Sequence, residues 1–308
     1  KLREMIVMNM NQMINEFIKF YASESENTAK SYARSVREYL AFTMSYTNWD
    51  LEELIEQSNK RNILMFVAML NERGLSPYTV NVYTSGVETF YKYLVEFDYR
   101  EKENPVNNVR RQNTKGIEQK QPYLEESDFQ KLIGATQIKS AKTKKFPFVS
   151  ARDKFLYTLN LTTGLRGSES LNLKVEQFES DILTILGKGG KLRRVKITQE
   201  IRECYNEYMK VRHMAFDGGT EDEGWVFVTI NGNQLSLKDF NKNLKRNLEK
   251  VGLSTDMASH GLRRSCVTHY LNEGVPIQQV ARLVGHSSTS TTMRYYKADG
   301  SEFDFMGI

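Results

Sequence analysis

Residues 161–171 read LTTGLRGSESL, and this stretch decides the fold of the second half of the chain. The apolar run Phe155–Thr162 predicts a buried helix, and Gly164 predicts where it ends. Arg166 follows at once, with Glu169 three residues later. The two could form a surface ion pair of i,i+3 spacing. Alternatively, Arg166 presents a phosphate-binding guanidinium, which is planar, forked and always charged.

A glycine-rich turn lies about 20 residues downstream, between two β-rich runs, Asp181–Leu186 and Leu192–Ile197. This pattern predicts a β-hairpin. The turn, Gly187-Lys188-Gly189-Gly190-Lys191, lacks the spacing and the Ser/Thr of a Walker A phosphate loop. Lys188 is then either a solvated turn residue or a lysine that reaches into a groove and protonates a leaving oxygen.

Two further motifs carry histidine. In His260-Gly261-Leu262-Arg263-Arg264, a His and an Arg three residues apart lie on one helix face. A buried structural His is the ordinary interpretation, but the same pair suits one phosphate, with charge from Arg263 and proton transfer from His260. The second motif is Gly285-His286, followed by Tyr295 and Tyr296. A tyrosine hydroxyl has a pKa near 10 and needs neighbouring groups to activate it as a nucleophile.

The remaining elements of this half are read from periodicity and breakers. They are a helix from Ser127 to about Ala135, a lysine-rich loop at 136–150, helices at 199–214 and Ser236–Val251, a short strand at Trp225–Thr229, and helical pieces broken at Gly274-Val275-Pro276 and Gly285-His286.

The first hundred residues predict four amphipathic helices and an all-α domain. The first two are indicated by apolar residues at helical spacing in 13–21 and in 32–40. The third covers Lys60–Arg73, and the fourth begins at Ser76-Pro77 and runs to Leu94. We expect the aromatic stripes of these helices to form a core. Residues 107–122 are polar and basic and predict a linker, either a solvated tether or a strap across a phosphate backbone.

Composition sets broad limits. The chain has 308 residues, of which 40% are hydrophobic and 26% charged, as in an ordinary globular protein of about two domains. Cys204 and Cys266 are not in metal-ligand spacing, so we predict no disulfide framework or zinc site and expect a reducing cytoplasm. The net charge is +5. The first 114 residues hold 14 basic and 15 acidic residues and the remainder 29 and 23, so a nucleic acid partner suits the second half.

Taken in order, these motifs resemble the signature of the tyrosine recombinases, above all the Xer and simple phage or transposon integrase branch. They run from Arg166 to Tyr295, and the helical first hundred residues resemble the family's SAM-like core-binding domain. The resemblance implies a mainly α fold with a small β-hairpin or sheet in an α+β catalytic domain. It implies a two-domain, C-shaped DNA clamp, with a core-binding domain at 1–106, the linker at 107–122, and a catalytic domain with a C-terminal tail at 123–308.

The resemblance also implies a role for each matching residue. Arg166 and Arg263 would clamp the scissile phosphate, and His286 would support the phosphate and the nucleophile. Glu169 would support the site without direct chemistry. Cationic groups of this kind can neutralise a phosphorane transition state, so we expect no metal and no cofactor.

The remaining roles concern protons and the covalent bond. Lys188 would be the general acid for the 5′ hydroxyl, and His260 would assist proton transfer. Tyr295, selected over Tyr296 by its spacing from His286, would form a 3′-phosphotyrosyl bond. His269 is expected to have a structural or supporting role.

The implied function is site-specific recombination of duplex DNA through a Holliday junction, for integration or excision of a mobile element or for resolution of replicons. The implied assembly is a homotetramer on synapsed sites, with the C-terminal tail on a neighbouring subunit and accessory proteins in some systems. We expect a bacterial, nucleoid-associated protein without a membrane segment. The alternatives are a type IB topoisomerase-like enzyme that relaxes DNA, a non-catalytic DNA-binding regulator, and a helical interaction module with no DNA role.

Overall fold

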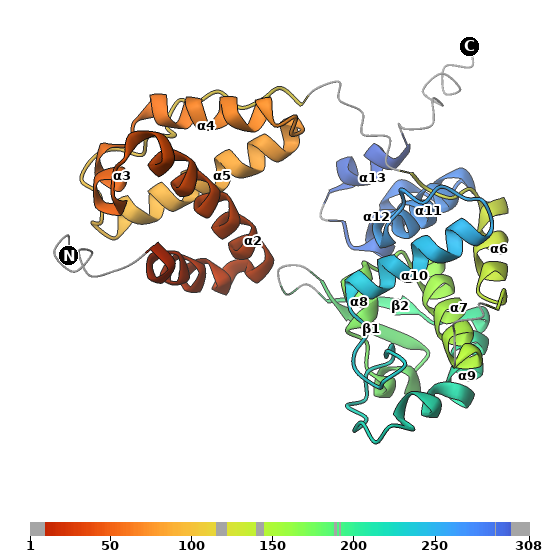
Figure 1. Cartoon of the computed structure of the whole chain (residues 1–308). Helices are drawn as coiled ribbons and strands as arrows, with labels where there is room; N and C mark the ends of the chain where they lie inside the picture. Colours follow the sequence, from red (N-terminus) through yellow and green to blue (C-terminus); the bar gives the residue numbers. More distant parts are fainter. Residues whose placement is uncertain are drawn as a thin grey trace, which may run out of the picture. The chain divides into compact units, whose positions relative to one another are not determined.

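The computed structural model describes residues 10–114, 122–139, 145–187, 190, 192–286 and 288–296, without the side chains of residues 22–27 and 294–296. The chain divides into two compact units, residues 1–118 and 119–308 (Figure 1). This division falls inside the predicted linker, 107–122. The described part is mainly helical with one small antiparallel sheet, which confirms the predicted fold class. None of the described helices is both long and apolar enough to cross a membrane.

Within its described residues, the first unit contains four helices, α2 (Met10–Thr47), α3 (Leu51–Gln57), α4 (Lys60–Glu72) and α5 (Pro77–Glu96). The prediction of two separate helices within residues 13–40 is wrong. The polar stretch between them contains no Gly or Pro, so α2 continues through it as one helix of 38 residues. The short helix α3 was not predicted. It begins at a capping box in which Asp50 and Glu53 exchange hydrogen bonds.

The aromatic residues of this unit form its core, as predicted. Phe17, Tyr39, Phe66, Phe90 and Tyr91 are fully buried. Their rings meet edge to face, for example Phe17 with Phe90 at a centroid distance of 5.5 Å. Such pairs contribute about 0.5–1.5 kcal/mol beyond the area they bury. These side chains therefore hold α2, α4 and α5 together and are not available to stack on bases.

The first part of the predicted linker packs against this unit. Val109 is buried in its core. The Gln112 backbone N–H donates to Asn81 Oδ1 at 2.8 Å, and Asn81 Nδ2 donates to the Gln112 carbonyl at 3.0 Å. Arg111 forms an ion pair with Glu88 of α5. Up to residue 114, this segment is therefore not a free tether.

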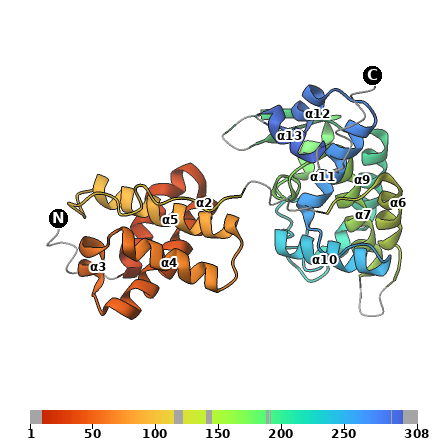
Figure 2. The same cartoon turned by 90° about the horizontal axis from the view of Figure 1, so that it is seen from above.

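The second unit is built around a central helix. Its elements are α6 (Glu126–Ala135), α7 (Phe146–Thr163), α8 (Gly167–Leu171), the 3-10 helix η1 (Val175–Glu179), β1 (Ile182–Leu186), β2 (Leu192–Lys196), α9 (Gln199–Arg212), the 3-10 helix η3 (His213–Phe216), α10 (Leu237–Lys250), α11 (Ser259–Asn272), α12 (Ile277–Val284) and α13 (Thr289–Tyr296). Helix α7 is buried along most of its length and packs against α9 and α11. In Figure 2, α11 lies beside α12 and α13, which it also contacts.

The predicted hairpin is present, with β1 and β2 antiparallel and Leu186 opposite Leu192. The prediction of a strand at Trp225–Thr229 is wrong. This stretch forms only two isolated bridges, Lys174 with Trp225 and Val228 with Gln234. The stretch is apolar because Val226, Phe227 and Val228 fill the core next to α7. Their burial therefore comes from the packing of a loop and not from hydrogen-bonded pairing of strands.

Candidate active site

Arg166 stands at the tight turn between α7 and α8. Helix α7 ends at Gly164, which has a left-handed φ of 61°. A Cβ at this position would come within 2.6 Å of Val284 Cγ1 and 3.2 Å of Cys266 Sγ, so glycine is required both by backbone conformation and by space. Leu165 is fully buried and anchors the turn. Arg166 is the next residue and is the N-cap of α8, with its side chain 36% exposed.

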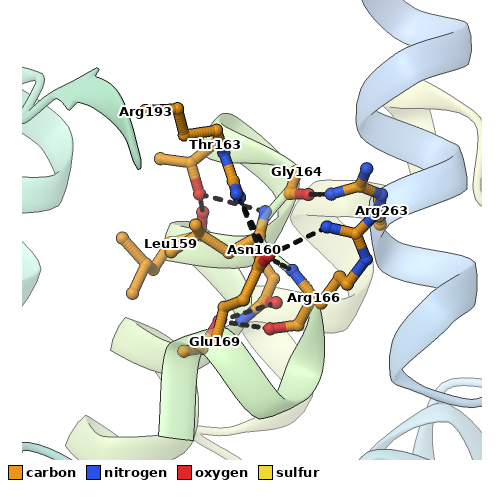
Figure 3. Close-up of polar contacts among 10 residues, drawn as sticks. Leu159, Asn160, Thr163, Gly164, Arg166, Glu169, Arg193 and Arg263 are labelled. Atoms are coloured by element: carbon orange, nitrogen blue, oxygen red, sulfur yellow. Dashed lines mark hydrogen bonds and ion pairs between the residues drawn. The ribbon is translucent and has the colours of Figure 1, made fainter. Parts of the chain in front are cut away.

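The carboxylate of Glu169 holds Arg166 in place (Figure 3). Glu169 Oε2 accepts from the Arg166 backbone N–H at 2.7 Å, and Oε1 accepts from Arg166 Nη1 at 2.9 Å. Arg193 of β2 donates to the same carboxylate, from Nη1 to Oε1 at 3.0 Å and from Nη2 to Oε2 at 2.6 Å. Burial acts to raise the pKa of Glu169, but the hydrogen bonds from Arg193 and Arg166 outweigh it and lower the pKa to about 2.

Arg263 approaches the same turn from α11. Its side chain is fully buried, and Nη1 donates to the Gly164 carbonyl at 2.7 Å. Figure 3 shows Arg263 extending from α11 toward Gly164, on the side of the turn away from Arg193. Arg166 and Arg263 are therefore tied to one turn by different elements, as the hypothesis of a common phosphate requires.

His260 lies one helical turn before Arg263, near the start of α11. Desolvation is the largest cause that lowers the pKa of its imidazole. The positive charges of Arg263, Arg264 and Arg166 lower that pKa further. The neutral imidazole is therefore favoured at neutral pH, and a neutral imidazole can accept or pass on a proton.

His286 joins this group from the end of α12. Gly285, with φ 70°, ends that helix, and His286 Nδ1 lies 2.8 Å from Thr292 Oγ1 of α13. Either of these two atoms can be the donor. The pKa of His286 is lowered to about 4, first by desolvation and then by the charges of Arg263, Arg166, His260 and Arg193. The groups that lower this pKa electrostatically are cationic or imidazole groups, so the electrostatic environment of His286 favours an anion.

The structure brings five of the predicted site residues together. They are Arg166, Glu169, His260, Arg263 and His286. Lys188 lies outside the described residues. Tyr295 belongs to α13, which packs on α11 and α12, but its side chain is outside the description.

Sequence reasoning missed Arg193 and Thr292. For Arg193 a signal was present. Side chains two apart in a strand share a face, and Val195 is an apolar residue of the predicted strand. Arg193 must then point inward with Val195, and an inward arginine needs an acceptor. For Thr292 the signal is weaker. Its hydroxyl reaches His286 only because of the way the chain turns between α12 and α13.

His269 lies apart from this group and has a structural role. Its ring contacts Phe129 at a centroid distance of 5.7 Å, and its Nδ1 lies 3.7 Å from Glu126 Oε2, so it joins α11 to α6. With Glu273 these groups place three possible metal-ligand atoms within 4.8 Å of one another. Both carboxylates are exposed, and we interpret the group as a solvated charged surface beside a cavity of about 300 Å³.

The arrangement can bind an anion and transfer protons. Three guanidinium groups and two imidazoles gather at the turn, and the one carboxylate shown among them, Glu169, is shared by Arg166 and Arg193. Preorganised donors of this kind stabilise charge that develops on phosphate oxygens.

Comparison with known proteins gives one consistent result. The sequence profile of the phage integrase family matches residues 122–302, and that of the phage integrase N-terminal SAM-like domain matches residues 14–98. The chain is 25% identical to the tyrosine recombinase XerD of Listeria innocua over 292 residues, which covers 93% of this chain and 94% of the relative. It is 27% identical to XerC of Bacillus subtilis, with 94% and 91% covered.

Solved structures agree in fold. The XerH site-specific recombinase bound to a palindromic difH substrate superposes with a TM-score of 0.70 at 20% identity, over 93% of this chain and 80% of that one. A Tn1549 transposon integrase in complex with transposon right-end DNA superposes with a TM-score of 0.69 at 17% identity, over 94% and 95%.

Proposed function

This chain belongs to the phage integrase family and is a site-specific tyrosine recombinase, and from that premise we propose that it cuts and rejoins duplex DNA through Tyr295. The observation that carries the proposal is the meeting of Arg166 and Arg263 at the Gly164 turn, with His286 tied to the helix that contains Tyr295. The charge at this turn suits a phosphodiester, and the nearby helix supplies a nucleophile.

The two arginines bind the nonbridging oxygens of the scissile phosphate. Arg166 is partly exposed and held by Glu169, so its guanidinium can turn one edge to the ligand. The side chain of Arg263 is fully buried and contributes positive charge next to the phosphate site. His286 donates from its ring to the phosphate or to the nucleophile, with its orientation set by Thr292.

Cleavage is a transesterification in which one P–O bond replaces another. Tyr295 Oη attacks phosphorus, the bond to the 5′ oxygen breaks, and a 3′-phosphotyrosyl bond forms. Lys188 donates a proton to the leaving 5′ oxygen, and the phenol proton passes to the imidazoles, with His260 assisting. Because the new bond is also a phosphodiester, a 5′ hydroxyl can reverse the step without ATP.

Strand exchange requires two sites held together. We propose a homotetramer on two synapsed duplexes that passes through a Holliday junction, with the segment 297–308, outside the described residues, docking on a neighbouring subunit. Accessory proteins would set direction, and the protein would act in the cytoplasm on the nucleoid. The relatives named for site-specific recombination and the DNA complexes of the similar structures support this reading over a regulator without catalysis.

The test is covalent capture on DNA. Nicked duplexes tiled across the DNA that borders the gene would be incubated with the protein in EDTA and run on a denaturing gel. We expect an adduct on the 3′ phosphate with the wild-type protein and none with Tyr295→Phe, which should still bind DNA. The matched control is Tyr296→Phe, which should form the adduct. An adduct lost in Tyr296→Phe and kept in Tyr295→Phe would contradict the choice of nucleophile.

A second measurement separates recombination from relaxation. A labelled and an unlabelled duplex that carry the same site would be mixed with the protein. A recombinase yields strands joined between the two duplexes, whereas a topoisomerase-like enzyme reseals each duplex on itself. Adducts without exchange on any paired substrate would favour the topoisomerase alternative.

A further inference from the structure

Arg193 is a charged residue on the buried face of a β-strand. It lies opposite Ile185 in the hairpin and on the same face as Val195, and its side chain is 10% exposed. A guanidinium in such a place is unfavourable unless acceptors satisfy it. Here the acceptor is the Glu169 carboxylate, which receives two parallel bonds at 3.0 and 2.6 Å. Arg193 is thus fixed in direction as well as in charge.

The carboxylate it binds is the one that holds Arg166. Each oxygen of Glu169 is shared between the two arginines. Oε1 accepts from Nη1 of both, and Oε2 accepts from the Arg166 backbone N–H and from Arg193 Nη2. Without Arg193, Glu169 would be held by the Arg166 backbone N–H and by a guanidinium that is 36% exposed, so the carboxylate would keep some freedom to turn. The bidentate bond to β2 removes that freedom.

Arg193 also touches the turn that precedes His286. A Cβ added to Gly285 would lie 3.0 Å from Arg193 Cδ and 3.2 Å from its Nη1, so the turn and this side chain are in close contact. The charge of Arg193 also acts on His286, where it helps to lower the pKa. The side chain of Arg193 therefore connects β2 to the carboxylate that holds Arg166 and to the end of α12.

We propose that Arg193 is a positioning residue that fixes Glu169, and through it Arg166, relative to the turn that carries His286. This inference rests on the proposed function. Arg193 acts through its neighbours and not on the scissile phosphate itself. A misplacement of about 1 Å in a reacting group can lower a rate about 10²-fold, so precise support of Arg166 would matter to the chemical step.

The test compares two neighbouring arginines of one strand. Arg193→Lys keeps the positive charge but cannot donate two parallel bonds. Arg194→Lys is the matched control, because Arg194 is exposed on the opposite face. On the nicked duplex that the wild type cleaves, we expect Arg193→Lys to lower the single-turnover rate at saturating protein about 10–100-fold. Its affinity for the duplex should stay close to the wild-type value, and Arg194→Lys should keep the wild-type rate at saturation.

Two further measurements separate positioning from other roles. A 5′-bridging phosphorothiolate substrate, whose sulfur leaves without a proton, should not rescue Arg193→Lys, since the defect lies in placement of charge. The cleavage rate of the double variant Arg193→Lys with Glu169→Gln should be little lower than that of the slower single variant. Both changes break the same contact between Arg193 and Glu169. Full rescue would assign Arg193 to support of Lys188 and would overturn the inference, as would additive losses.

The outcomes also separate this inference from the function on which it rests. Adduct formation by the wild type with an unchanged rate in Arg193→Lys overturns the positioning role alone. A lower melting temperature with an unchanged rate would likewise reduce Arg193 to a stabilising ion pair. If the wild type forms no adduct on any duplex, the proposed function fails and takes this inference with it.

Discussion

Two buried arginines, one in each unit, show how the same side chain serves opposite purposes. Arg100 in the first unit is 4% exposed and donates to backbone carbonyls at the end of α3, including Glu56 at 3.1 Å and Ser58 at 2.8 Å. Its guanidinium also lies over the ring of Tyr91, 5.2 Å from the centroid. Carbonyl dipoles and an aromatic ring thus meet its charge, so it stabilises the fold.

Arg263 in the second unit is more deeply buried and has different neighbours. It donates to the Gly164 carbonyl, and its charge acts on two imidazoles, His260 and His286. The charges of Arg263 and of its arginine neighbours lower the pKa of both imidazoles, so the surroundings of these imidazoles favour an anion. Burial of one arginine therefore does not indicate a functional site, whereas the proposed site requires several arginines and histidines gathered at one turn.

Of the two arginines, Arg263 should have the larger effect on cleavage. We expect Arg263→Met to lower the single-turnover cleavage rate by at least about 10²–10³-fold, since it removes a preorganised charge. Its free energy of unfolding should change by less than about 2 kcal/mol. The lost bond to Gly164 is offset because a charge no longer has to be buried. Quench-flow cleavage and urea unfolding measure the two quantities.

Arg100→Met is the matched substitution in the first unit and should reverse the pattern. It leaves the buried carbonyls of Ile55 and Ser58 without this donor, each at a cost of about 1–3 kcal/mol, so the free energy of unfolding should fall. The folded fraction should cleave at the wild-type rate. The comparison breaks down if Arg263→Met unfolds the protein while Arg100→Met does not.

The pH dependence of the free energy of unfolding should also differ between the two units. The unfolded His286 imidazole has a pKa near 6.5 and the folded one about 4. Between these values only the unfolded chain binds the proton, so the free energy of unfolding falls as the pH falls through this window. We expect the second unit to lose about 1–2 kcal/mol between pH 7 and pH 5 from this group. The stability that ionised Glu169 contributes is lost only at lower pH, as the pH falls from 4.5 toward 2.

The measurement can be confined to the second unit. The chain has two tryptophans, one in each unit, so in a Trp49→Phe background the fluorescence of Trp225 reports the unfolding of this unit alone. His286→Gln should reduce the pH-dependent loss and leave the part that comes from His260, whose pKa is also lowered. His213→Gln, at an exposed residue, should leave the loss unchanged. An unchanged slope in His286→Gln would show that other groups cause the acid sensitivity.

The residues of the proposed site were easier to name from the sequence than the residues that support them. Arg166, His260, Arg263 and His286 could be named because the order of their motifs resembles the tyrosine recombinase signature. Arg193 could not be named as readily, because its partner Glu169 is 24 residues away and meets it only when β2 packs on α8. Contacts between elements depend on packing, which short sequence patterns do not contain.

The same limit explains the errors in the fold. The break predicted within α2 came from a polar stretch, but polarity without Gly or Pro does not end a helix when its two ends pack on α5. The strand predicted at Trp225–Thr229 came from β-branched and aromatic residues that fill the core from a loop. In both places tertiary packing overrode a local preference.

The smallest expected effect concerns Thr292, which is fully buried and bonds His286 at 2.8 Å. Thr292→Val keeps the shape but removes the hydroxyl, and the loss of one hydrogen bond of about 1–1.5 kcal/mol corresponds to roughly a tenfold lower cleavage rate. Thr292→Ser keeps the hydroxyl and should stay near the wild-type rate. Because Thr292 and Tyr295 belong to the same helix, the bond aligns His286 with that helix, so the loss should appear in the rate at saturating protein and not in DNA affinity. A defect confined to DNA affinity would mean that this bond shapes the DNA-binding surface and does not orient His286. The contrast between Arg100 and Arg263 would then still hold, but the orientation of the imidazole would not be part of it.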